Sequence, residues 1–399
     1  MAKTNWQHFK GPARGIAAAV TAGVMGLGLL ATGPAYAAEP YNIDVVLALS
    51  GGGSFLGLAE QKALQQQEPI LGTIGGRPVH FTFYDDQSSP QTAVQLATQI
   101  KSKNPAVMLG STLVADCGAM APLMAKGPVM YCVSPGLYPK EGGYVFSTSN
   151  STHDLATAMV RYFGMTGRTK IALITSTDAS GTDAAKQVKA AIAANKNVQL
   201  VGEATFNPKD VSAAAQIQRL KSAGPQALIA WSTGAAIGTV FKAVVDAGLD
   251  IPVATTNGNQ TFAQMHQYAG ILPKTLYIPT SQWPKSNEPV PQAVADAKKA
   301  FYDSFAKAGV KPDFASTAAW DPALLVVSAL KKLGPTATAE QVRDYLSKLK
   351  GFAGINGTYD FTKVPQRGLD ESNVVVTQWD KTADNWTVVS KPRGIPLGK

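Results

Sequence analysis

Short apolar runs alternate with longer segments along the chain after residue 40. Runs such as 41–49, 79–84 and 227–231 are rich in β-branched and aromatic residues, which is typical of strands buried on both faces. The longer segments between them are predicted as helices, and one begins with a Ser-Pro pair, a common helix start. This alternation predicts parallel sheets flanked by helices, an α/β fold.

The expected elements fall into two similar halves. The first half has strands 41–49, 79–84, 106–109 and 129–133 and helices 55–67, 89–102 and 115–125. The second, from His153 onward, has strands 170–174, 199–205, 227–231 and 252–255 and helices 154–163, 182–194, 212–222 and 236–247. Helices 291–308, 317–333 and 339–349 follow, and the chain ends with hairpin-like strands 373–379 and 386–389. Two doubly wound lobes are therefore expected, although the halves show no sequence repeat.

Residues 1–37 carry the three parts of a secretory signal peptide. Three basic residues and no acidic residue lead into a largely apolar run at 16–30, and Ala35-Tyr36-Ala37 fits a small-residue cleavage site. A membrane anchor is the alternative, but a span needs about 20 apolar residues and this run is shorter and Gly-rich. We therefore expect export, with cleavage near Ala37.

Composition and charge narrow the class of partner. The 399 residues are 45% hydrophobic and 16% charged, which fits roughly two or three folded domains rather than a disordered chain. A net charge of +9 alone would suggest nucleic acid, but loss of residues 1–37 removes three basic side chains and leaves about +6. No basic run exceeds two residues, so we expect no nucleic-acid partner.

The cysteines and histidines point to no metal site. Cys117 and Cys132 are the only cysteines of an expectedly exported chain, so they either form a disulfide or remain two small buried side chains. The four histidines form no ligand motif with one another or with a cysteine. No metal and no cofactor are therefore expected.

No set of catalytic residues is visible. Ser54 lies in a Gly-rich segment that departs from the G-x-S-x-G spacing by one residue, and no Lys-Ser/Thr pair follows the glycines as a P-loop requires. Asp85 and Asp86 end a strand, where adjacent side chains point apart, so we expect them in solvent rather than as an acid–base pair. A binding protein is expected, not an enzyme.

Four short segments, taken in order, carry a resemblance to a known family. They are Ala48-Leu49-Ser50-Gly51, Ile74-Gly75-Gly76-Arg77-Pro78, Tyr84-Asp85-Asp86 followed by Pro90, and Trp320-Asp321-Pro322-Ala323. Together they resemble the type I periplasmic solute-binding proteins of ABC transporters, specifically the branched-chain amino-acid-binding group and its aromatic-acid-binding branch. The resemblance covers nearly all of residues 41–390.

The resemblance implies two discontinuous lobes joined by a three-strand hinge. Lobe one is expected at 41–155 and 288–357, and lobe two at 156–287 and 358–399. The family binds a small molecule between lobes that close on it, acts in the periplasm as a monomer and delivers to an inner-membrane ABC permease. A periplasmic sensor for a membrane receptor is the alternative role.

The loops that follow the strands are expected to hold the ligand. On lobe one the candidates are Ser50, Phe55, Ser111, Thr112, Val114, Ser134, Gly136 and Leu137. On lobe two they are Ser180, Trp231, Thr233, Asn257, Gln260 and Trp283. The N–H groups of the Gly-rich loop after residue 50 suit an anion, with a plain tight turn as the alternative. Asp116 is expected to cap the next helix, and Trp231 either lines the cleft or belongs to the core.

Two departures from the family pattern bear on the ligand. Ser180 stands where amino-acid-binding relatives carry a Tyr, and Asn257 stands near their acidic residue for the α-ammonium group. A buried ammonium without a carboxylate partner is strongly disfavoured. The expected ligand is therefore a small carboxylate without an amino group, best an aromatic acid, with Trp231, Phe55, Tyr138 or Trp283 along its tail. A branched-chain amino acid or an amide is the alternative.

Overall fold

The computed structural model describes residues 39–398. The expected signal peptide at 1–37 lies outside these residues. In the described part of the chain, no helix is both long and apolar enough to cross a membrane.

The first sheet has six strands in the order β2-β3-β1-β4-β5-β6. They are β1 (Tyr41–Leu47), β2 (Thr73–Ile74), β3 (Arg77–Asp85), β4 (Val107–Leu109), β5 (Val129–Cys132) and β6 (Val145–Ser147). All pairs are parallel except the β2–β3 pair. Val45 lies between Phe83 and Leu109 in the register, which gives the sheet the continuous apolar strands of a parallel sheet buried on both faces.

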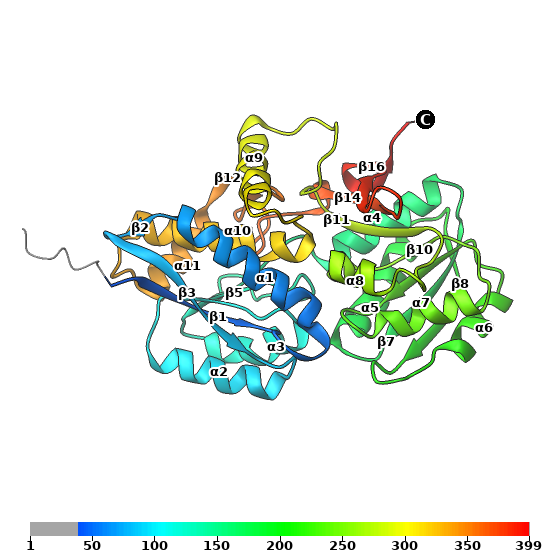
Figure 1. Ribbon diagram of the computed structural model, residues 1–399, viewed down its shortest axis with the longest axis horizontal. Helices are drawn as coiled ribbons and strands as arrows, with labels where there is room; N and C mark the ends of the chain where they lie inside the picture. Colours follow the sequence, from blue (N-terminus) through cyan, green and yellow to red (C-terminus); the bar gives the residue numbers. More distant parts are fainter. Residues whose placement is uncertain (1–38, 399) are drawn as a thin grey trace, which may run out of the picture. The chain divides into compact units, whose positions relative to one another are not determined.

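Helices cover both faces of the first sheet (Figure 1). On one face lie α1 (Ser54–Gln67), α10 (Phe314–Leu333) and α11 (Ala339–Lys348), and on the other α2 (Pro90–Ser102) and α3 (Val114–Met120). Helix α9 (Gln292–Lys307) packs its Phe301 and Phe305 against Trp320 of α10. Ser89 caps α2 and Asp313 forms a capping box with Ser316, so both helix starts satisfy N–H groups that would otherwise lack partners.

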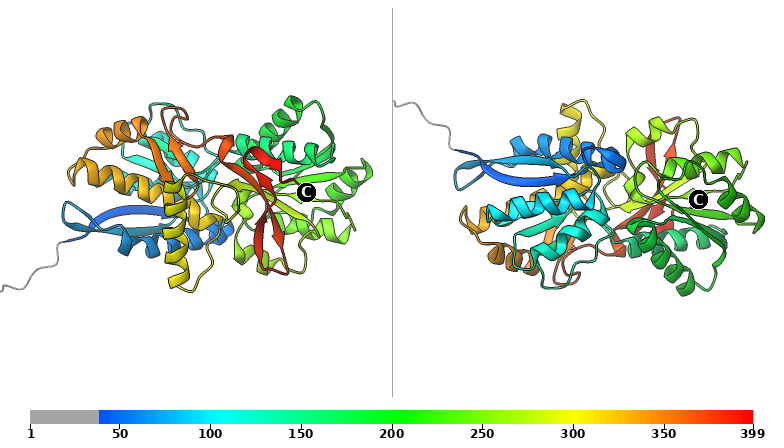
Figure 2. Two further views of the ribbon diagram at one scale, coloured as in Figure 1. Left: turned by 90° about the horizontal axis from the view of Figure 1, so that it is seen from above. Right: turned by 90° about the horizontal axis from the view of Figure 1, so that it is seen from below.

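The second sheet has seven strands in the order β15-β14-β11-β10-β9-β7-β8. They are β7 (Lys170–Ser176), β8 (Gln199–Phe206), β9 (Ala227–Trp231), β10 (Val253–Ala254), β11 (Leu276–Ser281), β14 (Val374–Asp380) and β15 (Asn385–Val388). Helices α4 (Thr152–Met165) and α5 (Ala179–Ala194) cover one face, and α6 (Ala214–Ser222), α7 (Ile237–Asp246) and α8 (Phe262–Gln267) the other. Figure 2 shows the C-terminal strands, in red, beside the green strands, where β14 pairs antiparallel with β11.

The chain passes between the two sheets three times, after β6, after β11 and before β14. The last passage follows a hairpin of β12 (Lys350–Gly354) and β13 (Gly357–Asp360), and a short pair, β16 (Ser390–Lys391) with β17 (Ile395–Pro396), ends the fold. Tyr359, Phe361 and Leu369 pack in the core of the first sheet. These apolar side chains hold residues beyond the predicted boundary at 357/358 to the first sheet, and the lobe bounds stay predictions.

The predicted alternation of strands and helices is confirmed, with most boundaries within three residues. The prediction missed β2, β6, β11, α8, the β12–β13 hairpin and the β16–β17 pair. Pro279 lies within β11 and cannot donate a main-chain hydrogen bond, so it weakens the strand signal of that segment. The others are short, and a run of a few residues carries little periodicity.

Cys117 of α3 and Cys132 of β5 form a disulfide, with 6.0 Å between their Cα atoms. Both are fully buried in the apolar cluster between the first sheet and α2. The sequence leaves open whether the two cysteines form a disulfide or stay unbonded, and in the structure they are bonded.

Reduction of this disulfide is expected to lower the free energy of unfolding by about 3 kcal/mol. The bond joins residues 15 positions apart, and a loop of that length restricts the unfolded chain by roughly this amount. Urea unfolding with and without dithiothreitol measures the loss. The double variant Cys117→Ala/Cys132→Ala is the control, and it should unfold at the same urea concentration in both buffers. Equal midpoints for the wild type in the two buffers would contradict the prediction.

Arg367 is a buried cation at the passage between the sheets. Its guanidinium donates to the carbonyls of Thr148 and Ser149, in the first passage, at 3.0 and 3.1 Å. It also donates to the carbonyls of Pro135 and Leu137, in the loop after β5, at 3.1 and 2.5 Å. One side chain thus connects two passages with the loop after β5.

Arg367→Lys is expected to lower the free energy of unfolding by about 2–3 kcal/mol. Lysine keeps the charge but lacks the planar fork, so it leaves buried carbonyls without donors. Chemical denaturation measures the change. Arg219→Lys is the matched control, because Arg219 is exposed, and it should stay within about 0.5 kcal/mol of the wild type. Equal losses in the two variants would show that Arg367 acts as an ordinary surface residue.

Candidate ligand-binding site

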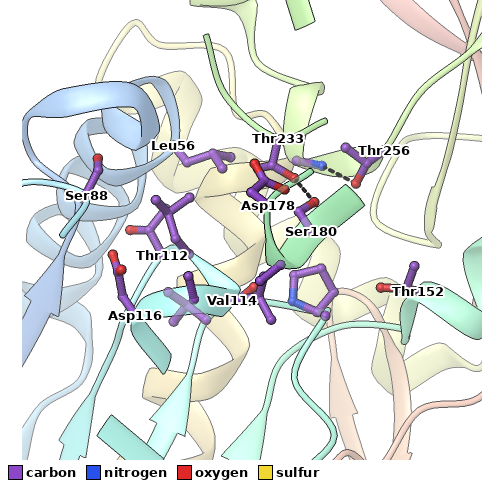
Figure 3. A pocket seen from close by; sticks show the side chains of 18 of the residues that line it. Leu56, Ser88, Thr112, Val114, Asp116, Thr152, Asp178, Ser180, Thr233 and Thr256 are labelled. Atoms are coloured by element: carbon purple, nitrogen blue, oxygen red, sulfur yellow. Dashed lines mark hydrogen bonds between the residues drawn. The ribbon is translucent and has the colours of Figure 1, made fainter. Parts of the chain in front are cut away.

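A cavity of about 230 Å³ lies at the carboxyl ends of the parallel strands of both sheets (Figure 3). The first lobe contributes Leu56, Glu60, Ser88, Pro90, Thr112, Leu113, Val114, Ala115, Asp116, Val133, Ser134, Pro135, Gly136 and Phe314. The second contributes Thr152, Asp178, Ala179, Ser180, Pro208, Trp231, Thr233, Thr256 and Gly258. This is where open α/β sheets generally bind ligands.

The lobes touch directly beside the cavity, next to Thr233. Ala235 N–H donates to the carbonyl of Gly52 at 3.1 Å. Gly234 has a φ of +85°, and a Cβ there would lie 2.3 Å from the Gly52 oxygen. Only glycine allows this close approach, so the loops after β1 and β9 meet main chain to main chain.

Several hydroxyl groups on the cavity wall are already bonded within the protein. Thr112 Oγ1 accepts from Ala48 N–H at 3.1 Å and donates to Glu60 Oε2 at 2.5 Å. Ser180 and Thr233 join their hydroxyls at 2.7 Å, as Figure 3 shows. These hydrogen bonds fix the orientation of these side chains on the cavity wall.

Glu60 is a cavity residue that the sequence analysis missed. It lies on α1 within a run of glutamines and alanines, where nothing distinguishes it from a solvent-facing residue. Its side chain is buried, and burial raises its pKa to about 8. The hydrogen bond from Thr112 opposes this shift, whereas the nearby carboxyls of Asp86 and Asp313 add to it.

Asp116 does not cap a helix. The N-cap of α3 is Leu113, and Asp116 lies in the first turn with its side chain fully buried. Within residues 39–398, neither of its carboxyl oxygens accepts a hydrogen bond from an N–H group or a hydroxyl, and its hydrogen-bonding neighbour is the Asp86 carboxyl. Burial, followed by the neighbouring Asp86 carboxyl, raises the pKa of Asp116 to about 7.

Asp85 and Asp86 differ from the expected solvated pair. Asp86 is fully buried and accepts hydrogen bonds from Ser88 N–H and from the Ser111 hydroxyl. Asp85 accepts from the N–H groups of Leu49 and Ser50 at 3.0 and 3.1 Å. The residues that lead into the Gly-rich loop therefore donate to a protein carboxylate, and Gly53 N–H of the loop donates to the Ser88 hydroxyl at 3.0 Å, so these N–H groups are not free for an anion.

The wall of the cavity contains carboxyl groups and, within the described residues, no Lys, Arg or His. Its third acid, Asp178, caps α5 and accepts from Gly181 N–H and Ser176 Oγ. The searched part of the chain also holds no group of three or more side chains suited to a metal ion. Glu60 and Asp116, the fully buried acids of the wall, both lie on the first lobe.

Half of the predicted site residues line the cavity. These are Thr112, Val114, Ser134, Gly136, Ser180, Trp231 and Thr233. The other half lie elsewhere: Ser50, Phe55, Ser111, Leu137, Asn257, Gln260 and Trp283. A role in ligand binding stays a prediction for the first set.

The residues outside the cavity have other contacts. Ser50 bonds to Asp85, Gln260 donates to Thr377 at 3.0 Å, and Asn257 accepts from the Thr256 hydroxyl at 3.3 Å. Phe55 and Trp283 pack with the core of the second lobe, whereas Leu137 packs with the cluster around the disulfide. Tyr138, also suggested for the tail pocket, is 49% exposed and accepts from His153 N–H.

Phe314 is a second lining residue that the sequence analysis missed. The predicted helix begins at Thr317, but the capping box of Asp313 starts α10 at Phe314. Asp313 and Ser316 at N-cap and N3 give the signal for this start, in a less common form than Ser/Thr with Glu/Gln. The aromatic side chain is thereby placed on the cavity wall.

Glu60→Gln is expected to stabilise the protein increasingly as pH rises. The folded pKa of Glu60 is about 8 against an ordinary 4.5, so the folded state holds the extra proton between these values. Stability therefore falls as pH rises through this window, and the variant lacks this loss. Its advantage in unfolding free energy should grow by about 1–3 kcal/mol from pH 5 to pH 8, measured by urea unfolding.

The exposed Glu141 supplies the control. Glu141→Gln should differ from the wild type by a constant amount over the same pH range. A Glu60→Gln difference that is flat with pH would mean that Glu60 ionises as a surface carboxyl does.

The sequence matches a known protein family. The periplasmic binding protein family matches residues 40–384. No curated protein compared with the sequence matches it.

Solved structures share the fold. An extracellular ligand-binding receptor from Rhodopseudomonas palustris HaA2 superposes with a TM-score of 0.78 at 22% identity, covering 88% of this chain and 99% of that one. A solute-binding protein of an R. palustris ABC transporter in complex with benzoate gives 0.73 at 19%, covering 90% and 98%. A branched-chain amino acid transporter substrate binding protein from Streptococcus pneumoniae in complex with isoleucine gives 0.73 at 19%, covering 88% and 99%.

The family and these neighbours are binding proteins rather than enzymes. At these identities the structures show the fold, and the family match covers most of the chain. The protein therefore belongs to the periplasmic binding protein family, as two α/β lobes with a cavity between them.

Proposed function

We propose that this protein is the extracytoplasmic solute-binding component of an ABC importer and takes a small solute with a flat, apolar body. The observation that carries the proposal is the cavity lined from both lobes, because a solute there contacts both at once. Such contacts stabilise the closed arrangement over the open one. We propose an inner-membrane permease as its partner and a monomer as its oligomeric state. After cleavage near Ala37 the protein would lie in the periplasm. A sensor would use the same cavity with a membrane receptor.

The apolar part of the cavity suits an aromatic or branched body. Trp231 at the end of β9 and Phe314 at the start of α10 supply aromatic surface, and Leu56, Val114 and Val133 supply aliphatic surface. A dry cavity of about 150 Å³ binds benzene in another protein, so about 230 Å³ accommodates a ring with a short substituent.

The polar end of the solute has two candidates. The aromatic carboxylate predicted from the sequence would use the Ser134 hydroxyl and the main chain near Gly136. It would also meet the buried carboxyls of Glu60 and Asp116 without a facing cation. Of the two residues that argue against an ammonium group, Asn257 lies outside the cavity wall, whereas Ser180 lines it and is bonded to Thr233. The two acids therefore favour the alternative, an amino acid or another nitrogen-bearing solute.

The relatives are compatible with both candidates. One structure of this fold holds benzoate and another holds isoleucine, each at 19% identity to this chain. Titration calorimetry with benzoate, cinnamate, leucine and phenylalanine therefore compares the two classes directly.

Trp231→Ala is expected to weaken the tightest of these ligands at least about tenfold, because an aromatic wall is lost. Tyr138→Ala is the control, since Tyr138 is exposed and off the cavity wall, and its affinity should match the wild type. Calorimetry measures both. If no compound binds, or if both variants bind like the wild type, the proposed function is wrong.

A further inference from the structure

We propose that Asp116 binds a positively charged nitrogen of the solute and that Glu60 supports it from the same side of the cavity. This inference rests on the proposed function, because it names the group that the same cavity recognises. In relatives that bind amino acids, the acidic residue for the ammonium group is expected on lobe two, near the position of Asn257. In this protein the acidic residue would lie on lobe one instead.

Asp116 has the geometry of a residue that lacks its partner. Its side chain is fully buried, it lines the cavity, and among the described residues no N–H group or hydroxyl donates to either oxygen. Figure 3 shows its carboxyl group beside Thr112, at the Ser88 end of the cavity. A buried carboxylate without hydrogen bonds is costly, so a donor from the solute would remove a defect of the empty site.

The groups around Asp116 supply at most one such donor. Asp86, at the end of β3, is its close carboxyl neighbour, but one Asp86 oxygen accepts from Ser88 N–H and the other from the Ser111 hydroxyl. A proton shared between the two acids would satisfy at most one oxygen of Asp116. The other oxygen remains free for the solute.

Glu60 adds acceptor capacity on the same lobe. Thr112 donates to its Oε2 atom, and Asp313, before α10, lies near enough to raise its pKa further. Glu60 of α1 and Asp116 of α3 line this end of the cavity, and two further acids lie close to them: Asp86, directly after β3, and Asp313, directly before α10. The cavity wall opposite them, within residues 39–398, offers no basic side chain.

The negative charge of these acids favours a positively charged solute over an anion. An anion would add a further negative charge to acids that already repel one another, and would require them all to stay protonated. A cation would pair with Asp116 in a charge-assisted hydrogen bond and reduce the repulsion among the neighbouring acids. The geometry therefore favours an ammonium or amidinium group over a carboxylate at this end.

Three compounds with one ring and different polar ends test the inference. Benzylamine, benzyl alcohol and benzoate are titrated into the full mature protein by calorimetry at pH 7. Benzylamine is expected to bind at least about tenfold tighter than benzyl alcohol, the minimum for a charge-assisted bond, and benzoate weakest. Asp116→Asn should weaken benzylamine at least about tenfold and leave benzyl alcohol within about threefold.

Two controls keep the result specific. Asp303→Asn removes the same charge from an exposed position on α9, and its benzylamine affinity should equal that of the wild type. Thermal unfolding without ligand confirms that Asp116→Asn is folded, and Glu60→Gln provides a second variant that should also weaken benzylamine.

Tighter binding of benzoate than of benzylamine would overturn the inference, as would an Asp116→Asn variant that binds benzylamine like the wild type. Benzoate binding that depends on Trp231 but not on Asp116 would overturn it and leave the proposed function standing. No response to any of the compounds would count against both.

Discussion

The four hydrogen bonds of Arg367 hold the region on which the cavity depends. The side chain is 5% exposed, and burying a guanidinium is tolerated only when strong acceptors surround it. Its acceptors are carbonyls of the loop after β5 and of the first passage between the sheets. Ser134, Pro135 and Gly136 of that loop line the cavity. The position of this wall is therefore coupled to the passages that join the lobes.

This arrangement also shapes the charge of the cavity. The guanidinium of Arg367 is engaged by main-chain oxygens of the loop after β5 and does not belong to the cavity wall. On the cavity wall, Glu60 and Asp116 are buried, and desolvation raises the pKa of both. The cavity thus combines an apolar body, formed by Trp231, Phe314 and aliphatic side chains, with an acidic end. That combination fits a solute with a ring or branched chain and a nitrogen at one end.

The sequence predicts the fold well because the fold depends on local patterns. Apolar runs and helix starts mark nearly every element, and Thr112, Ser134 and Trp231 from strand-end loops lie on the cavity wall. The site chemistry is less predictable, because it depends on burial. Glu60 sits in a polar run and Asp116 in a helix start, and both positions ordinarily face solvent. Only the packing of α1 and α3 against the strands shows that these acids are buried.

The proton balance of binding tests most directly whether the acidic end receives a cation. Benzylamine is titrated calorimetrically at pH 7 in buffers of different ionisation enthalpy, and the slope of heat against that enthalpy gives the protons exchanged. With pKa values of about 7 and 8, Asp116 and Glu60 are partly protonated in the free protein, and a cation favours their charged forms. Binding should therefore release a fraction of a proton into the buffer. Proton uptake, or no exchange, would contradict the pairing of these acids with a cationic solute.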